Sequence, residues 1–216
     1  MTSKFTYKRL DKKNAAVLFI DHQTGLFNLV QDYSPNEFKN SVLALADIAK
    51  FFKLPTILTT SFEEGPNGPL IPELKAAFPN APYIARPGQI NAWDNENFVK
   101  AVKDTGKKQL IIAGIVTDVC VAFPTLSALE AGYDVFVITD ASGTINKDMR
   151  DAALMRIVHA GAQTLSWFSA VSELHRDWRN DITGLGNLLA NHVPAYKNLM
   201  DSYQAQTKRR KSRHVA

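Results

Sequence analysis

Three residues with reactive or charged side chains follow short apolar runs of the chain. Asp21 comes directly after the first run, Arg86 follows a short extended piece in the middle of the chain, and Cys120 comes shortly after a third run. A thiolate is a nucleophile, a carboxylate can take the thiol proton and pass it to a leaving amine, and a guanidinium can orient the carboxylate. If the fold brings the three together, these residue types predict acyl-transfer chemistry.

Each of these residues also has a plain structural interpretation. Asp21 is of a type that caps a strand end, Arg86 of a type that forms ion pairs, and a lone Cys120 is of a type that packs as a small apolar side chain. Convergence on one edge of a sheet would favour the site. A cysteine at a helix start is expected to be held as thiolate by the helix dipole and free amides. Arg86 lowers and burial raises the pKa of the Asp21 carboxyl, and the sequence does not rank the two.

The apolar runs predict the strands that would position these residues. They lack alternation, as buried strands covered on both faces do. The predicted strands are 15–21, 55–61, 109–115, 134–140 and 162–166, with a short extended piece at 82–85.

Helix signals lie between these strands. Ser34, Pro35 and Glu37 form a capping box with a proline at the first helical position. Further helical patterns lie at 72–77, 95–105, 119–131 and 146–160, and Pro124 predicts that the helix after Cys120 starts late or bends. Alternating strands and helices predict a single-domain, three-layer α/β/α fold with a mostly parallel central sheet. In such folds ligands collect outside the carboxyl ends of the strands.

The chain has 216 residues and a net charge of +4, of which a basic tail supplies five positive charges and leaves about −1 for the body. A nearly neutral body argues against a nucleic-acid partner. We expect one domain over 1–180, a helical appendage of the same domain over 181–207 and a disordered basic tail over 208–216. The apolar appendage predicts an oligomer contact or, alternatively, a helix folded back on its own sheet.

Location and redox state are constrained only weakly. A single cysteine cannot form an internal disulfide, and no run approaches the roughly 20 apolar residues of a membrane span. These features predict a cytoplasmic protein that does not enter a membrane. The lysines and the arginine among residues 4–13 leave an organellar targeting segment as the alternative.

Several pieces of the chain resemble the isochorismatase-like cysteine hydrolases, a family that includes nicotinamidases and N-carbamoylsarcosine amidases. The matching pieces are AVLFIDHQ at 16–23, IARP at 84–87 and GIVTDVC at 114–120. Longer pieces at 55–61, 85–95 and 174–181 resemble the YcaC-type branch of that family.

The resemblance implies a catalytic triad of Asp21, Arg86 and Cys120, with arginine where most of the family has lysine. It implies an oxyanion hole from the backbone amides of Thr117 and Cys120, and a cis peptide bond between Val116 and Thr117. The implied reaction is attack of the Cys120 thiolate on the carbonyl of a small non-peptide amide. Loss of the amine and hydrolysis of a thioester follow.

The surroundings of the triad are expected to form a substrate pocket. Its predicted lining residues are Gln23, Phe27, Asn91, Trp93 and Ile115, although Phe27 and Trp93 are equally of a type found in a core. Nicotinamidases that bind a cation carry histidines after the second strand, whereas residues 59–64 read TTSFEE. We therefore expect no metal and no cofactor. The YcaC-type resemblance also implies a homo-octamer.

Two other functions compete with the hydrolase. In one, the protein is a non-enzymatic thiol switch whose Cys120 is oxidised and whose assembly responds. In the other, it is an inactive member of the fold that is kept for its assembly surface.

Overall fold

The computed structural model describes residues 7–213, with side chains described up to Gln206, and its centre is a parallel sheet of six strands. The strands are β1 (Ala15–Ile20), β2 (Thr56–Ser61), β3 (Tyr83–Arg86), β4 (Gln109–Gly114), β5 (Asp134–Ile138) and β6 (Gln163–Leu165). Their order is β3-β2-β1-β4-β5-β6, and every neighbouring pair is parallel. Each predicted strand is present. Strands β1, β4, β5 and β6 end one or two residues earlier than predicted, and β2 ends at Ser61 as predicted.

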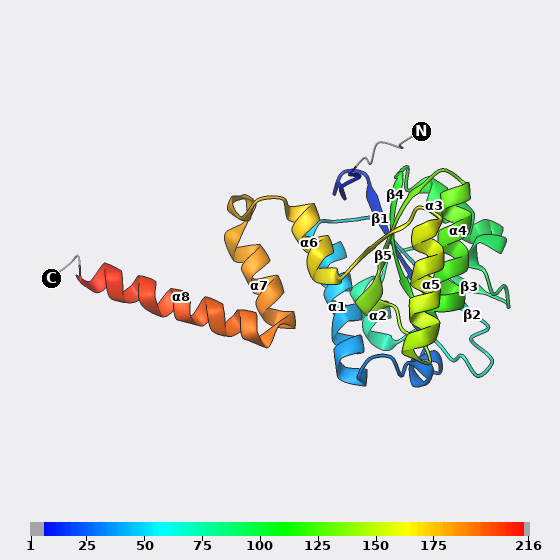
Figure 1. Cartoon of the computed structure of the whole chain (residues 1–216), viewed down its shortest axis with the longest axis horizontal. Coiled ribbons are helices and arrows are strands. Elements are labelled where there is room, and N and C mark those ends of the chain that lie inside the picture. Colours follow the sequence, from blue (N-terminus) through cyan, green and yellow to red (C-terminus); the bar gives the residue numbers. More distant parts are fainter. Residues whose placement is uncertain (1–6, 214–216) are drawn as a thin grey trace. The chain divides into compact units, whose positions relative to one another are not determined.

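Helices cover both faces of this sheet, which confirms the three-layer α/β/α class (Figure 1). The helices of this part of the chain are α1 (Pro35–Phe51), α2 (Pro72–Ala77), α3 (Glu96–Asp104), α4 (Ala122–Glu130), α5 (Lys147–His159) and α6 (Trp167–His175). Helices α1 and α2 lie on one face, and α3, α4 and α5 lie on the other (Figure 1). Right-handed crossovers explain why the helices divide between the two faces. From β1 the chain adds β2 and β3 on one side and then β4, β5 and β6 on the other, so the connecting helices change face.

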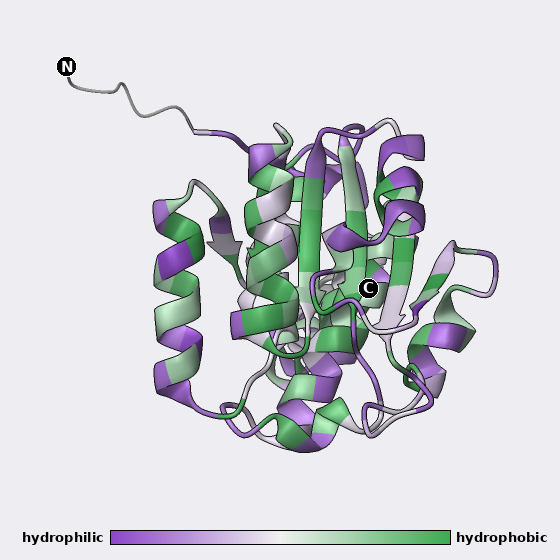
Figure 2. Cartoon of the chain, turned by 90° about the vertical axis from the view of Figure 1, so that its right-hand side faces the viewer, coloured by the Kyte–Doolittle hydropathy of each residue, from purple (hydrophilic) through white to green (hydrophobic). Residues whose placement is uncertain are grey.

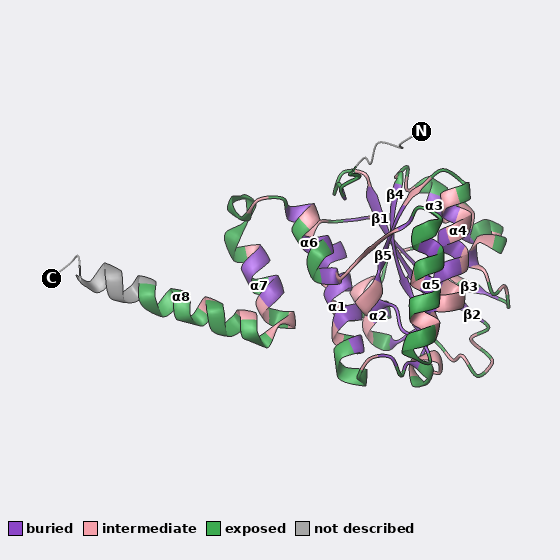
Figure 3. Ribbon diagram, viewed as in Figure 1, coloured by how far each residue is buried: buried purple, intermediate pink, exposed green. Residues whose placement is uncertain are grey.

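The core lies along the two faces of the sheet. Alternate residues of β1, Ala16, Leu18 and Ile20, pack with residues of the α3, α4 and α5 layer such as Phe98 and Ile157. The central strands are the most apolar and most buried ribbons (Figures 2 and 3). Each buried large apolar side chain contributes roughly 1.5–3 kcal/mol to folding, so the sheet is a rigid support for groups at its edge.

The predicted helix starts are confirmed by their caps. The Ser34 hydroxyl accepts the Glu37 amide at 3.4 Å and donates to the Glu37 carboxylate at 2.6 Å, with Pro35 in the first turn. The side chains of Asn95 and Asn146 cap α3 and α5 in the same way.

The helix after β4 differs from the predicted helix over 119–131. A π-helical turn, η3 (Thr117–Val121), comes first, and regular α4 begins only at Ala122. Pro124 lies in the first turn of α4, where its missing amide would have no intrahelical partner. The late start predicted from Pro124 is therefore confirmed, and Cys120 lies in the wider turn rather than in the α-helix.

The chain divides into two compact units, one ending at Leu174 and the other beginning at His175, six residues before the predicted appendage. The second unit contains η5 (Trp178–Asn180), α7 (Ile182–His192) and α8 (Pro194–Arg213). Helices α7 and α8 are separate because Pro194 disfavours a helical residue before it.

The backbone stays helical to Arg213, where we expected a disordered tail from residue 208. Lysine and arginine are good helix formers, and no glycine or proline interrupts them. The side chains beyond Gln206 and residues 214–216, which complete the predicted tail, lie outside the described part. No helix in the described part of the chain is long and apolar enough to cross a membrane.

Candidate active site

The three sequence-predicted catalytic residues lie at the carboxyl ends of parallel strands. Asp21 follows β1, Arg86 ends β3, and the η3 turn that carries Cys120 follows β4. Strands β1 and β4 are neighbours at the point where the strand order reverses, the usual place for a ligand site in such sheets. Gly114, at the end of β4, lets the backbone of β4 lie close to the end of β1, because a Cβ at this position would collide with the Ile20 carbonyl oxygen.

Asp21 is held in an unusual backbone conformation. It is fully buried and has a φ of 59°, a value that few residues other than glycine adopt. Its amide donates to the Thr59 carbonyl at 2.9 Å, and Oδ1 forms a buried ion pair with Arg86. Oδ2 has no hydrogen-bond partner among the described residues. The Cys120 thiol, like Arg86, interacts with this carboxyl group.

Arg86 is fixed by bonds around its whole guanidinium. Nε donates to the Thr59 hydroxyl at 3.1 Å, and another nitrogen donates to the backbone carbonyls of Gln89 and Ile90. The side chain is completely buried. A guanidinium in this position can orient the Asp21 carboxyl and offset its charge, but it does not carry protons.

The Cys120 thiol is neutral at rest, which corrects the expected thiolate. Burial of the sulfur raises the pKa of the thiol well above its ordinary value, and the neighbouring Asp21 carboxyl raises it further. The Val116 amide and Arg86 oppose this pKa shift only in part. One turn of η3 has too weak a dipole to overcome burial beside a carboxylate.

Burial also outweighs Arg86 in setting the pKa of the Asp21 carboxyl, a comparison that the sequence alone did not decide. Loss of solvation raises the pKa of the Asp21 carboxyl, and the opposing effects of Arg86 and Cys120 are smaller. A carboxyl with a raised pKa is a better proton acceptor, and it lies beside a thiol that must lose a proton to react.

The predicted oxyanion hole and cis bond need correction. The Thr117 amide donates to the Gly143 carbonyl at 3.0 Å, so it is not free to bind an oxyanion. The Cys120 amide stays a prediction. The cis peptide bond joins Ile115 and Val116, one residue before the predicted Val116–Thr117 bond. Spacing along a motif does not fix which bond is cis, because tertiary contacts select it.

Two predicted pocket residues are buried and support the fold around the site. The Gln23 amide donates to the Ser61 carbonyl at 3.0 Å and accepts the Ser61 amide at 2.9 Å, so its polar atoms hold the end of β2. Ile115 is fully buried beside β1. Phe27 is partly exposed, and its ring centre lies 5.2 Å from that of Phe38.

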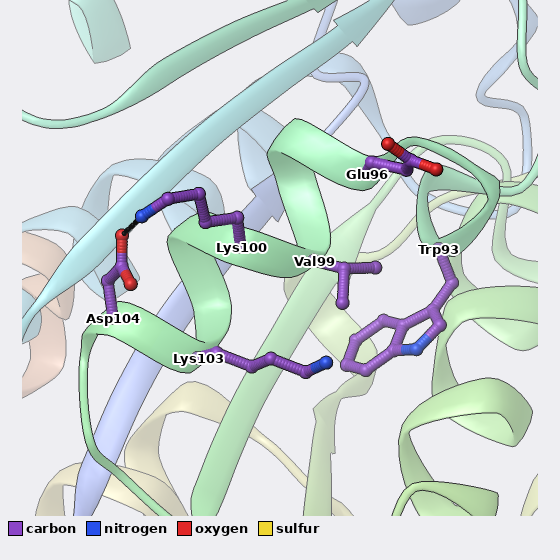
Figure 4. Close-up of a pocket in the computed structure, with 6 residues that line it drawn as sticks. All are labelled: Trp93, Glu96, Val99, Lys100, Lys103 and Asp104. Atoms are coloured by element: carbon purple, nitrogen blue, oxygen red, sulfur yellow. Dashed lines mark hydrogen bonds and ion pairs between the residues drawn. The ribbon is translucent and has the colours of Figure 1, made fainter.

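The other two predicted pocket residues lie on the segment after Arg86. Asn91 donates to the Ser127 hydroxyl on α4 at 3.1 Å. The Trp93 ring meets Phe98 and Tyr133 edge to face, and it also lines a hollow on the surface of α3. That hollow, of about 550 Å³, is lined by Trp93, Glu96, Val99, Lys100, Lys103 and Asp104 (Figure 4). The place of Trp93 in the substrate pocket stays a prediction.

Sequence reasoning missed several polar residues that support the site. Thr59 links Asp21 and Arg86, and His22 bonds the Ala141 carbonyl at 3.0 Å. Burial lowers the pKa of His22 to about 4, so the ring is neutral. The signal was a run of threonines in an otherwise apolar strand. In the described part of the chain, no group of three or more His, Cys, Asp or Glu residues is arranged to hold a metal ion.

Known proteins share this arrangement of sequence and fold. Residues 15–169 match the isochorismatase domain. The chain belongs to the isochorismatase family. It is 68% identical to the probable hydrolase YcaC of Escherichia coli over 204 residues, which cover 94% of this chain and 98% of that protein.

Two solved structures of the same branch superpose closely. YcaC from Pseudomonas aeruginosa, solved with hexane-2,5-diol and covalent acrylamide, has a TM-score of 0.92 and 74% identity, with 93% of this chain and 100% of that chain covered. The E. coli YcaC structure, described as an octameric hydrolase of unknown specificity, has a TM-score of 0.93 and 67% identity, with 94% and 100% covered. The predicted YcaC-type branch and its fold are therefore confirmed.

Proposed function

We propose that this protein hydrolyses the C–N bond of a small non-peptide amide through a thioester on Cys120. The observation that carries the proposal is the cluster in which a neutral, partly exposed Cys120 thiol meets the fully buried Asp21 carboxyl, whose pKa is raised, and a fixed, buried guanidinium. A probable-hydrolase relative at 68% identity supports the reaction class.

In the first half-reaction Asp21 acts as base and then as acid. The carboxylate takes the thiol proton as Sγ of Cys120 attacks the substrate carbonyl carbon. The resulting oxyanion is bound by the Cys120 amide, and Asp21 returns the proton to the nitrogen as the C–N bond breaks. The amine leaves, and the acyl group stays on sulfur as a thioester.

The second half-reaction consumes water. Asp21 takes a proton from water as its oxygen attacks the thioester carbonyl. The C–S bond then breaks, the acid product leaves, and the proton returns to the sulfur. Arg86 keeps the Asp21 carboxyl oriented throughout and does not transfer a proton. The balance of atoms requires no metal and no redox cofactor.

The thiol-switch alternative is less well supported by the geometry. Redox-sensing cysteines have a lowered pKa and are readily accessible, whereas burial raises the pKa of the Cys120 thiol. An inactive protein of the same fold would need neither the buried Asp21 carboxyl nor its ion pair with Arg86, both of which cost solvation free energy.

We also propose that the protein works as a homo-octamer without a nucleic-acid or membrane partner. The E. coli relative is described as octameric. The second unit carries exposed Leu199 and Tyr203 on one face of α8, since residues four apart share a helix face.

Alkylation of the thiol tests the chemistry, and acrylamide is a suitable probe because it is a small amide and reacts with thiols. We expect acrylamide to label Cys120 at neutral pH faster than it labels free cysteine, and we expect Asp21→Asn to slow labelling by about a hundredfold. Cys120→Ser is the control for the labelled site. A wild-type rate equal to that of free cysteine, or a rate unaffected by Asp21→Asn, would contradict the proposal.

A further inference from the structure

A short segment after β5 lies between the loop that follows Asp21 and the turn that carries Cys120. Thr144 in this segment is fully buried. Its amide donates to Oδ1 of Asp32 at 2.9 Å, and its hydroxyl donates to Oδ1 of Asp118 at 2.7 Å. Asp118 lies within η3, two residues before Cys120. One residue therefore joins the loop that follows Asp21 to the turn that carries Cys120, through its backbone amide on one side and its hydroxyl on the other.

Backbone bonds fix the place of this segment on both sides. The Gly143 carbonyl accepts the Thr117 amide at 3.0 Å, and the Gly143 amide donates to the Gly114 carbonyl at 3.2 Å. On the other side the Thr144 carbonyl accepts the Gln31 amide at 2.9 Å. The start of the η3 turn is thus held by the backbone, and the Asp118 contact holds a point nearer to the sulfur.

Asp32 gives the segment a buried, charged anchor. Its side chain is fully buried, Oδ2 has no hydrogen bond among the described residues, and Arg150 is its nearest cation at 3.8 Å. Burying a carboxylate with so little compensation costs free energy. Its directed bond to the Thr144 amide indicates a role in geometry rather than in stability.

We propose that Thr144, anchored by Asp32, is a positioning residue that holds the η3 turn where Asp21 can take the Cys120 proton. The inference rests on the proposed function, since it takes Cys120 as the nucleophile. Thr144 acts through Asp118 and touches no substrate. Loss of its hydroxyl releases the turn near the sulfur while the backbone bonds of Gly143 keep the fold.

Replacement of the hydroxyl by a methyl group tests the proposal. Thr144→Val removes the donor at constant shape and leaves the amide bond to Asp32, whereas Thr144→Ser keeps the donor. We expect Thr144→Val to slow acrylamide labelling of Cys120 about tenfold or more, because small displacements of reacting groups are costly. Thr144→Ser should label like the wild type.

Thr125→Val is the matched control. Thr125 is fully buried on α4, and its hydroxyl has no hydrogen-bond partner among the described residues. This control makes the same chemical change at the same burial without breaking a bond. Equal labelling rates in Thr144→Val and Thr125→Val would overturn the proposal.

Asp118→Ala provides a second variant, because Asp118 is partly exposed and its loss is compatible with folding. It should slow labelling as much as Thr144→Val, and the double variant should be no slower than either single variant, since all three remove the same contact. Additive losses would contradict a shared mechanism.

Hydrogen exchange separates this inference from the proposed function. If the wild-type thiol reacts no faster than free cysteine, the proposed function fails, and the amides of 117–121 still test the positioning role. Faster exchange there in Thr144→Val than in Thr125→Val supports the inference. Equal exchange in the two variants overturns it.

Discussion

At the scale of single residues, the central event of the proposed mechanism is proton transfer between Cys120 and Asp21. Burial raises the pKa of both groups, and the shift in each depends on the other. A stable thiolate is therefore not the resting form, and reactivity comes from a base placed beside a neutral thiol. Under the proposed mechanism, proton transfer therefore takes place when substrate binds, and the thiol is not activated in advance.

The pH dependence of labelling follows from the raised pKa of Asp21. The ionised carboxylate is the base, so the labelling rate should rise as pH increases through a pKa above the ordinary value of 3.8 and be lost below it. In Asp21→Asn the thiol must ionise unaided, so the rise should move to strongly alkaline pH. The rate of acrylamide labelling, measured across a range of pH, gives the profile of the wild type and that of Asp21→Asn. An identical profile in wild type and variant would exclude Asp21 as the base.

Substitution of Arg86 should expose the cost of the buried Asp21 carboxyl. Arg86→Gln leaves that carboxylate without its cation, so we expect a loss of about 3–5 kcal/mol in unfolding free energy. The acid limb of the labelling profile should also move to higher pH, because Arg86 lowers the pKa of Asp21.

The double variant Arg86→Gln/Asp21→Asn removes both charges and should recover much of the lost stability. Denaturant unfolding of the two variants gives the comparison. An Arg86→Gln protein as stable as the wild type would show that the ion pair does not compensate for burial of Asp21.

Residue types predicted which side chains meet at the sheet edge better than they predicted the electrostatics there. Asp21, Arg86 and Cys120 were recognised because each follows a strand, and strand ends share one edge of a parallel sheet. The protonation states were missed because they depend on burial and on distances between groups far apart in sequence. Thr144 and Asp32 were missed for the same reason, since their contacts join three separate loops.

At the scale of elements, the approach of β1 to the end of β4 determines whether the site can form. Gly114→Ala would place a methyl group against the Ile20 carbonyl, so β1 and β4 must shift at the site. We expect a loss of about 1–3 kcal/mol in unfolding free energy and slower labelling of Cys120.

Gly88→Ala is the matched control for this substitution. A Cβ at Gly88 would meet no atom within 4 Å, so the control should leave stability and labelling nearly unchanged. Thermal unfolding and acrylamide labelling measure both variants. Equal stability of the two would show that the sheet edge accommodates the methyl group without cost.

Element positions were predicted closely where the signal is local. The Ser34 capping box and the apolar run of each strand act within a few residues, so the sequence indicates them directly. The π-helical form of η3 was not predicted, and the cis bond was predicted one residue too late, because contacts with the segment at Gly143, far along the chain, are not visible in the local sequence.

At the scale of the whole molecule, we propose that the second unit supplies the subunit contacts of a homo-octamer. We expect light scattering to give eight times the 24.0 kDa mass of the chain. Leu199→Glu with Tyr203→Glu should lower that mass, because it places charge on one exposed face of α8. Ala205→Glu, exposed elsewhere on the same helix, is the control. An octamer that survives the double variant would exclude this face as a subunit contact.

The second compact unit begins at His175, whereas the predicted appendage begins six residues later, at 181. The composition changes only gradually around residues 175–181. A compact unit is defined by contacts between distant residues, and these cannot be seen in any single stretch of sequence. Helix content was predicted for 181–207, whereas the break at Pro194 and the continuation to Arg213 were not.

Trapping of the acyl-enzyme is the most direct test of a cysteine-dependent amide hydrolase. The protein is incubated with a library of small amides, quenched in acid and measured by intact mass and peptide mapping. We predict an adduct on Cys120 that equals the acyl part of a hydrolysed amide, is removed by hydroxylamine as a thioester should be, and is absent from Cys120→Ser. Amide hydrolysis that persists in Cys120→Ser, or that proceeds in the wild type with no acyl group on the sulfur, would contradict the mechanism.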